Sequence, residues 1–430
     1  MKTRVYVSFT AKKWKLPFLA SSLVSFILIL VAFVRSNPVK RVDQSLNDYR
    51  VASEQNNEGN GQFYLQTQLI QSPTRSPLLS APKLAYLISG TKGDSQRMKR
   101  VLQAIYHPNN QYILHLDLEA SPKERIGLAR YVKLEPIFVE FGNVDVIRKA
   151  NLVTYRGPTM TACTLHAAAI LLKKGCDWDW FINLSASDYP LITQDDLLYV
   201  FTYLPRNLNF LEHTSKLGWK ESQRVKPIII DPGFYMSKKS DIIWASQKRA
   251  VPNAFKLFLG SAWVVLTRSF VEYCVWGWDN LPRTILMYYA NVVSSPEGYF
   301  HTVICNTKEF RNTTVNHDLH HIVWDTPPKQ HPLSLHLEHF NEMRDSGAPF
   351  ARKFERDDPV LDKIDTQLLM RPFDHFTPGG WCIGNTENNT YPCSRRGDLN
   401  VIEPGPGAKR FQKLLMKLLT PEGYLANQCI

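Results

Sequence analysis

Glu297 is the carboxylate whose surroundings in the sequence best fit chemistry on a bound molecule. It lies in the segment SSPEGYFHTV, after a turn bounded by Pro296 and before an apolar run. Such a turn can present a carboxylate into a cleft, where it can take a proton from a hydroxyl group. A Glu in the first turn of a helix is also a favourable charge without any catalytic role. From these residues alone, both interpretations stay open.

The cationic pair Lys409 and Arg410, in the segment GPGAKRFQKLL, is a second candidate. The pair follows a Gly/Pro loop and begins a predicted amphipathic helix. Cations and helix-start amides together can stabilise the negative charge of a diphosphate. Solvent-exposed surface cations are the alternative interpretation.

Asp177 and Asp179, in the segment DWDW, have a spacing at which two carboxylates can hold a divalent ion. They precede a predicted strand at 180–184 instead of following it, so they belong to the wrong edge of a sheet for ligand binding. We therefore favour a solvated turn with Trp178 or Trp180 in the core, and we predict no metal site.

The apolar runs of the sequence predict how these residues are positioned. Buried strands are expected at 83–90, 112–117, 136–141 and 180–184, and helices at 95–105 and 159–174. This alternation indicates an α/β fold with a mostly parallel central sheet. Ligands of open sheets bind beyond the carboxyl ends of the strands, where Asp117 and Asp188 fall. Asp188 then either contacts substrate hydroxyls or caps a helix that begins near Thr193.

Composition excludes several classes of function. The 430 residues carry a net charge of +12, yet no long Lys/Arg run or nucleic-acid motif is present, so no nucleic-acid partner is expected. GxGxxG and Walker patterns are absent, which leaves dinucleotide and P-loop sites without support. The seven cysteines include no CxxC pair, so no zinc site is indicated. Cys382 and Cys393 bracket a short polar loop that a disulfide could close, with two free thiols as the alternative.

The N-terminal region predicts a membrane anchor. Residues 16–34 carry no charge over 19 positions and can cross a bilayer core of about 30 Å as a helix. Basic residues precede this segment, so residues 1–15 are expected in the cytosol and the remainder in the lumen. A cleaved signal peptide is the alternative, although its apolar core would be shorter. Residues 35–82 are rich in Asn, Gln, Ser and Pro and are expected to form an extended stem before a folded domain at 83–430.

Three Asn-X-Ser/Thr sequons fit a lumenal protein to different degrees. Asn312 and Asn388 lie in predicted loops and are candidate glycosylation sites. Asn183 lies in a predicted buried strand, so we expect it to be unused.

Several segments together resemble glycosyltransferase family 14, which contains the core-2/I-branching N-acetylglucosaminyltransferases and peptide xylosyltransferases. These segments lie within 83–310 and read LAYLISG, RVLQAIYHPNNQYILHLD, DWFINLSASDYPL, NFLEH, GSAWVVLTRSFVEY and SPEGYFHTV. The tail RPFDHFTPGGWC is similar to a plant branch whose members are β-glucuronosyltransferases acting on arabinogalactan-protein glycans. The resemblance implies a GT-A-like fold, a nucleotide-sugar donor and catalysis without a divalent ion.

The resemblance also implies roles for residues at the donor. Asp117 matches a carboxylate that contacts the uracil of the donor. Lys409 matches a lysine that, together with an arginine, replaces the metal at the diphosphate. Arg395 and Arg396 are the candidates for that arginine.

At the acceptor side, Glu297 matches the catalytic base of the family. The branching enzymes carry Ser-Pro-Asp-Glu, which would place the base at Gly298, whereas the xylosyltransferase pattern Pro-Ala-Glu places it at Glu297. Glu212 matches an acceptor-binding glutamate, and Lys220 and Arg224 resemble the basic residues just beyond it.

The resemblance and the anchor together lead us to expect a single-pass type II Golgi membrane enzyme. It would transfer glucuronic acid from UDP-glucuronate to galactose residues of arabinogalactan-protein glycans, with inversion and without a metal cofactor. The alternatives are an N-acetylglucosaminyl- or xylosyltransferase of the same family, or a non-catalytic lumenal glycan-binding protein.

Overall fold

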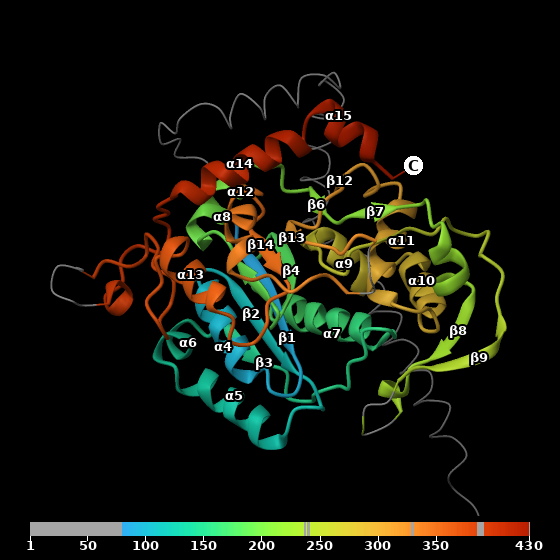
Figure 1. The fold of residues 1–430 in the computed structure, drawn as a ribbon, viewed down its shortest axis with the longest axis horizontal. Helices are drawn as coiled ribbons and strands as arrows, with labels where there is room; N and C mark the ends of the chain where they lie inside the picture. Colours follow the sequence, from blue (N-terminus) through green and yellow to red (C-terminus); the bar gives the residue numbers. More distant parts are fainter. Residues whose placement is uncertain (1–79, 236–237, 239–240, 328–330, 385–390, 430) are drawn as a thin grey trace, which may run out of the picture. The chain divides into compact units, whose positions relative to one another are not determined.

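The computed structural model describes residues 80–235, 238, 241–327, 331–384 and 391–429, all within the compact unit Tyr64–Ile430 (Figure 1). The predicted cytosolic tail, the membrane segment and nearly all of the stem lie outside these residues, as does Asn388. Within the described ranges, no helix is both long and apolar enough to cross a membrane.

A seven-stranded sheet forms the centre of the domain, with strand order β12-β6-β11-β4-β1-β2-β3. β1 is parallel to β2 and β4, β2 to β3, and β12 to β6, whereas β11 is antiparallel to both of its neighbours. The predicted mostly parallel α/β sheet is therefore confirmed. Its strands are β12 (Thr314–Val315), β6 (Asn209–Phe210), β11 (Val265–Thr267), β4 (Trp180–Ser185), β1 (Leu84–Gly90), β2 (Gln111–Leu116) and β3 (Val144–Val146).

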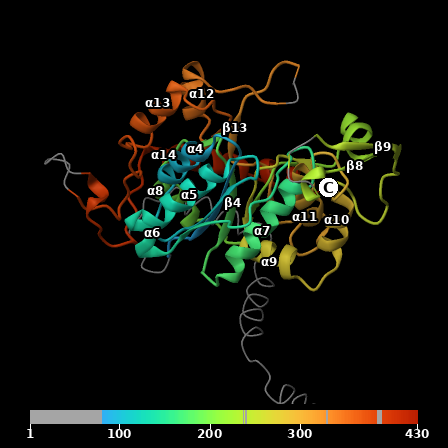
Figure 2. The same ribbon diagram turned by 90° about the horizontal axis from the view of Figure 1, so that it is seen from below.

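Alternating side chains of β1 divide the core into two layers. Tyr86 and Ile88 enter one apolar cluster and Ala85 and Leu87 the other, because successive side chains of a strand point to opposite faces. Helices cover both faces (Figures 1 and 2). The first face carries α4 (Ser95–Ala104), α5 (Pro122–Leu134), α6 (Pro136–Phe141), α8 (Gln194–Thr202), α12 (Phe340–Asp345), α13 (Pro359–Gln367) and α14 (Pro406–Leu418). The second face carries α7 (Thr159–Lys173), α9 (Arg268–Trp276), α10 (Leu281–Tyr289) and α11 (Tyr299–Asn306).

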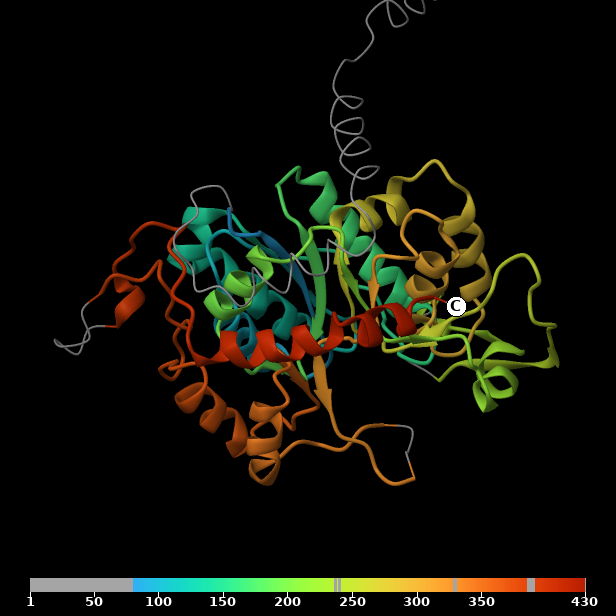
Figure 3. The same cartoon turned by 90° about the horizontal axis from the view of Figure 1, so that it is seen from above.

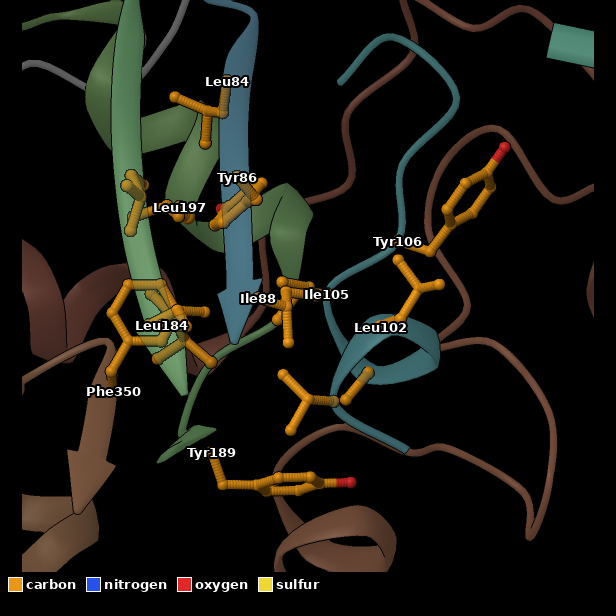
Figure 4. Packing of buried hydrophobic residues seen from close by; sticks show 14 of the residues in the cluster. Leu84, Tyr86, Ile88, Leu102, Ile105, Tyr106, Leu184, Tyr189, Leu197 and Phe350 are labelled. Atoms are coloured by element: carbon orange, nitrogen blue, oxygen red, sulfur yellow. The ribbon is translucent and has the colours of Figure 1, made fainter. Parts of the chain in front are cut away.

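The larger apolar layer is built around β1. Figure 4 shows Tyr86 and Ile88 of β1 in the same layer as Leu184 of β4 and Leu102 of α4. The Tyr86 ring stacks on Tyr112 with 5.4 Å between the ring centroids. Its buried hydroxyl donates a hydrogen bond of 2.9 Å to Gln194 Oε1, so the polar end of the ring is satisfied.

The start of α8 holds the C-terminal part of the domain in place. Thr193 caps this helix, and Asp196 completes a capping box with it. Asp195 Oδ2 accepts hydrogen bonds of 2.7 Å from the backbone N–H groups of both Gly380 and Glu403. Burial raises the pKa of Asp195 to about 6. α14 then packs along α8 (Figure 3).

Three small sheets and one irregular helix complete the part of the domain that surrounds the site. The first sheet joins β13 (His320–Ile322), β14 (Phe350–Arg352) and β5 (Asp188–Pro190). The others pair β7 (His213–Thr214) with β10 (Leu259–Gly260), and β8 (Pro227–Ile230) with β9 (Ile243–Lys248). A π-helical turn at Glu221–Val225 precedes β8.

One predicted element is wrong. Residues 136–141 form the helix α6 instead of a strand, because Pro136 occupies its first position and Gly142, with φ of 58°, ends it in the left-handed conformation. The edge strand of the sheet is β3, a few residues later. The other predicted strands and helices are confirmed as β1, β2, β4, α4 and α7.

The cysteines form two disulfides. Cys382–Cys393 confirms the predicted pair. Cys305–Cys429 links α11 to the segment beyond α15 (Pro421–Tyr424), and the sequence did not indicate it. His213 lies beside this second disulfide, but both sulfurs are bonded to each other and not available as thiolate metal ligands.

Candidate functional site

A cavity of about 960 Å³ lies at the carboxyl ends of β4 and β6, within the range of small-molecule sites. Glu212, which follows β6, lines it. Residues 260–263, which precede the antiparallel strand β11, also line it. This is the edge at which open α/β sheets bind ligands. The charged side chains of the wall are Arg156, Lys220, Arg224, Arg352, Lys353, Glu212 and Glu297.

Glu297 reaches this cavity because a short turn is pinned from behind. The turn is a 3₁₀ segment at Ser295–Glu297, preceded by Ser294 in the left-handed conformation with φ of 55°. The Ser295 hydroxyl bonds the backbone carbonyls of Tyr289 and Val292, at 2.6 and 2.8 Å. The buried serine thus fixes the turn to the end of α10, and the predicted turn presentation of Glu297 is confirmed.

Gly298 lets the chain pass Tyr289 immediately after the catalytic candidate. A Cβ atom at position 298 would overlap the hydroxyl and ring of Tyr289. The Tyr289 ring is buried, and its hydroxyl hydrogen-bonds Thr302 Oγ1 at 2.8 Å, so it has little freedom to move. The turn therefore needs glycine here for steric reasons.

Two side chains hold the Glu297 carboxylate. The Tyr155 hydroxyl donates a hydrogen bond of 2.9 Å to Oε1, and the Arg224 guanidinium forms an ion pair with Oε2. Burial, and next the negative charge of Glu297, raise the pKa of Tyr155 well above its usual range, so the hydroxyl stays protonated and donates. The orientation of the carboxylate is consequently fixed by partners from two separate segments, the loop before α7 and the π-helical turn before β8.

The loop that carries Tyr155 and Arg156 is tied to the Glu297 turn. The Arg156 carbonyl accepts a hydrogen bond of 2.8 Å from the Ser294 N–H. Buried Asp231 fastens the other end of the loop, since it accepts bonds from the N–H and the hydroxyl of Thr159 at 3.2 and 2.7 Å. No local pattern indicates Tyr155 or Arg156 as site residues, because neither stands in a recognisable motif.

The structure brings three predicted acceptor-side residues, Glu212, Lys220 and Arg224, into the same cavity as Glu297. Gly260 allows this arrangement, because a side chain there would overlap the Glu212 carbonyl. Burial, reinforced by Asp318, raises the pKa of Glu212, and Lys220 opposes the shift.

Asp188 has a different place from the one predicted. Its side chain has no exposed surface, and Oδ2 accepts a 2.6 Å hydrogen bond from the Ser185 N–H. Oδ1 lies 3.7 Å from the Arg352 guanidinium, its cross-strand partner between β5 and β14. Asp188 therefore neither lines the cavity nor caps α8, but supports Arg352, whose guanidinium stacks 3.9 Å from the centroid of the Trp263 ring.

The predicted donor residues are not gathered in the cavity wall. Asp117 is buried at the end of β2, where Oδ1 accepts 3.0 Å bonds from the Thr91 hydroxyl and the Glu119 N–H. Lys409 is exposed on α14. Arg395 is also exposed, and Arg396 forms an ion pair with Glu140 of α6. None of these four residues lines the cavity as described.

Asp177 and Asp179 lie before β4, at the sheet edge opposite the cavity, as predicted. Asp179 accepts a 2.8 Å bond from the Lys83 N–H, and Asp177 lies 3.5 Å from the Arg268 guanidinium. Trp178 and Trp180 are buried, which confirms the predicted turn with tryptophan in the core.

The sequons at Asn312 and Asn183 fall where expected, whereas Asn388 lies outside the described residues. Asn312 is exposed in a turn, whereas Asn183 is buried in β4 and hydrogen-bonds Ala262 and Val264 through its amide.

The wall of the cavity combines three kinds of chemistry. Its five cationic side chains outnumber its two carboxylates, which favours an anionic ligand. Glu297 can accept a proton from a hydroxyl group once that hydroxyl replaces one of its two present partners. Trp219, Trp244, Trp263 and Trp324 add aromatic surface.

Comparison with known proteins places this site in a family. Residues 84–344 match the model of the Core-2/I-Branching enzyme family. The chain is similar to β-glucuronosyltransferase GlcAT14B of Arabidopsis thaliana, with 66% identity over 81% of this chain and 80% of that protein. Its identity to GlcAT14A of the same plant is 61%, over 86% of this chain and 83% of the relative. GlcAT14C is 56% identical over 81% and 85% of the two chains.

Substitution of Gly298 by alanine tests the steric account of the turn. We predict that Gly298→Ala lowers the free energy of unfolding by about 1–3 kcal/mol, because the added methyl group must displace the buried Tyr289 ring. Urea unfolding followed by tryptophan fluorescence measures this change.

Gly127→Ala is the matched control, since a Cβ at position 127, within α5, meets open space. It should be neutral or stabilising by up to about 1 kcal/mol, as expected for alanine in a helix. Equal stability of the Gly298→Ala variant and the wild type would contradict the close approach to Tyr289.

Proposed function

This chain belongs to the Core-2/I-branching enzyme family of glycosyltransferases, and we propose that it is an inverting β-glucuronosyltransferase that uses UDP-glucuronate. The names of its relatives, which are β-glucuronosyltransferases, support glucuronate as the transferred sugar. The observation that carries the mechanism is the Glu297 carboxylate, held by Tyr155 and Arg224 in a cavity rich in cations.

The proposed reaction is a single displacement. An acceptor hydroxyl enters beside Glu297 and takes the place of one of its two hydrogen-bond partners. Glu297 removes the proton as the hydroxyl oxygen attacks the anomeric carbon, and UDP leaves from the opposite face, which inverts the configuration. The rigid turn at Ser295–Glu297 fixes the distance between base and hydroxyl, as proximity catalysis requires.

The leaving diphosphate needs positive charge, which we propose comes from Arg352 and Lys353 at the end of β14. Both line the cavity, and Asp188 with Trp263 holds the Arg352 guanidinium in place. Fixed cations can stabilise a developing diphosphate charge without a metal. Asp117, at the end of strand β2 of the central sheet, remains our candidate for binding the uracil. The diphosphate roles predicted for Lys409, Arg395 and Arg396 lack such support from their positions.

The acceptor is proposed to be a galactose residue of an arabinogalactan-protein glycan. Glu212 and Lys220 lie in the same wall as Glu297 and offer the acceptor and donor groups that orient sugar hydroxyls.

The cellular setting is likewise a proposal, namely a type II Golgi membrane protein with a lumenal catalytic domain at 83–430. The uncharged segment 16–34 with basic residues before it supports the topology. The disulfides Cys305–Cys429 and Cys382–Cys393 suit an oxidising compartment.

Removal of the proposed base is the direct test of the mechanism. Glu297→Gln should lower kcat by at least about 100-fold, because a neutral amide cannot accept the proton. The rate is measured as glucuronate transfer to a β-galactan acceptor by the purified full-length protein. Glu221→Gln is the control, since Glu221 lies in the neighbouring π-helical turn, pairs with Lys226 and does not line the cavity. Full transfer activity in the Glu297→Gln variant would contradict the proposed role of Glu297 as the base.

A donor screen with and without EDTA tests the sugar and the metal-free chemistry together. We expect transfer from UDP-glucuronate, with no more than about a twofold change on addition of EDTA, because protein cations neutralise the diphosphate. Preference for UDP-N-acetylglucosamine or UDP-xylose would redirect the donor assignment. Loss of activity in EDTA would overturn the metal-free account, and absence of UDP release with every donor would favour a glycan-binding protein.

Protease protection tests the topology. In sealed microsomes the domain at 83–430 should resist added protease until detergent is present. Digestion of the domain in intact vesicles would contradict a lumenal location.

A further inference from the structure

Two tryptophans form an exposed wall of the cavity next to Glu297. The exposed fraction is 58% for Trp219 and 47% for Trp244, although tryptophan is highly buried on average. Neither Trp219 nor Trp244 takes part in the proposed displacement reaction. We propose that Trp219 and Trp244 bind pyranose rings of the acceptor beyond the ring that is glucuronidated, so that the enzyme recognises an oligosaccharide. This inference rests on the proposed function for the identity of the reacting sugar.

The position of each tryptophan relative to the base follows from its contacts. The Arg224 guanidinium pairs with Glu297 and lies 5.5 Å from the centroid of the Trp219 ring. The Arg156 guanidinium lies 5.6 Å from the Trp244 ring, and the adjacent residue, Tyr155, bonds Glu297. The Trp219 ring is therefore connected to the base through Arg224, and the Trp244 ring through Arg156 and its neighbour Tyr155. A second sugar ring can reach this wall while the first presents its hydroxyl to Glu297.

The wall is part of a rigid unit that is fastened to the Glu297 turn. Trp244 lies on β9, opposite Ile229 of β8. Ile229 packs with Ile242 and with Val293, which immediately precedes the turn. The Ile229 N–H and carbonyl also bond Asn291, at 3.1 and 2.8 Å. These contacts set the position of Trp244 relative to the Glu297 turn, which lets Trp244 select acceptors by the spacing of their rings.

Cations line the cavity both beside Glu297 and at β14, so the two exposed tryptophans are distinguished by their position beside the base. Arg352 and Lys353 come from β14, which pairs with β5 directly after β4, and they are placed to meet the anionic donor. Trp244 comes from β9 of the hairpin and Trp219 from the segment before the π-helical turn, and both lie beside arginines near the base. An indole face suits a neutral pyranose, because the carbon-bound hydrogens of one galactose face carry partial positive charge and the ring face is negative. Inversion requires the acceptor hydroxyl to attack the anomeric carbon from the face opposite the leaving UDP. An acceptor that lies along the two tryptophans meets this requirement if the diphosphate lies at Arg352 and Lys353.

The rival occupant of an exposed indole is the uracil base of the donor, which could stack there. Asp117, the candidate for the uracil, lies at the end of β2 and does not line the cavity beside the two tryptophans, which supports the sugar assignment. Binding of UDP alone separates the two occupants experimentally.

The experiment measures kcat/KM on β-linked galactose acceptors of one to five units, with purified full-length protein. Wild-type kcat/KM should rise with acceptor length. In Trp244→Ala the ratio between the longest and the shortest acceptor should fall roughly tenfold, mainly through KM, as loss of one stacking contact predicts. Trp219→Phe and Trp244→Phe, which keep an aromatic face, should retain most of the length dependence. Trp278→Ala is the control, since that ring is fully exposed and does not line the cavity.

Binding of galactan oligomers and of UDP, each measured by calorimetry, keeps the test independent of turnover and of the donor. The inference is wrong if the wild type shows no dependence on acceptor length, or if Trp244→Ala weakens UDP binding as much as oligomer binding. If another sugar is transferred but oligomer binding still weakens in Trp244→Ala, the proposed donor fails and the aromatic wall stands. If the Trp244→Ala protein does not fold, Trp219→Ala decides the question, because it should likewise weaken oligomer binding and leave UDP binding unchanged.

Discussion

The ion pair and hydrogen bond that grip the Glu297 carboxylate are the constraint around which this domain is organised. Tyr155 and Arg224 approach from a loop before α7 and from the π-helical turn before β8, 142 and 73 residues before Glu297 in the sequence. Each of these two segments is itself held in place. Asp231 hydrogen-bonds Thr159 at the end of the loop that carries Tyr155. The π-helical turn that carries Arg224 leads into β8, whose Ile229 packs against Val293. Catalytic geometry within a fraction of an ångström is hard to maintain on isolated loops, and cross-links of this kind provide it.

The same organisation explains the distribution of charge. Five cationic side chains line the cavity proposed to bind the donor, and most of them have a partner that limits their motion. Arg352 is stacked on Trp263 and backed by Asp188, and Arg156 pairs with Asp241. Preorganised charges cost no reorganisation during the reaction, which makes them more effective than flexible lysines on a surface. Asp188 illustrates the cost of this arrangement, because it is a fully buried carboxylate retained to hold a cation.

Much of this could be predicted from the sequence, and the failures have physical reasons. The family, the parallel sheet, the Glu297 turn and the Cys382–Cys393 pair followed from local patterns and short spacings. The prediction of a strand at 136–141 is wrong because a short run that is apolar except for Glu140 fits a strand as well as a helix, and the decisive signals are Pro136 and Gly142 at its ends. Arg352, Tyr155 and Cys305–Cys429 depend on long-range packing, which no local pattern in the sequence encodes.

Gly298 and Tyr289 have a consequence for how this family can diverge. The buried ring occupies the space that any side chain at position 298 would need. A chain of the branching type, with its glutamate one residue later, therefore requires a smaller or displaced residue at the position of Tyr289. The two positions should vary together among descendants, and a single substitution at either one would pass through an intermediate with an overlap or a void. The sequence position of the proposed catalytic carboxylate therefore depends on two residues together, Gly298 and Tyr289, and the buried Tyr289 has no proposed contact with the substrate.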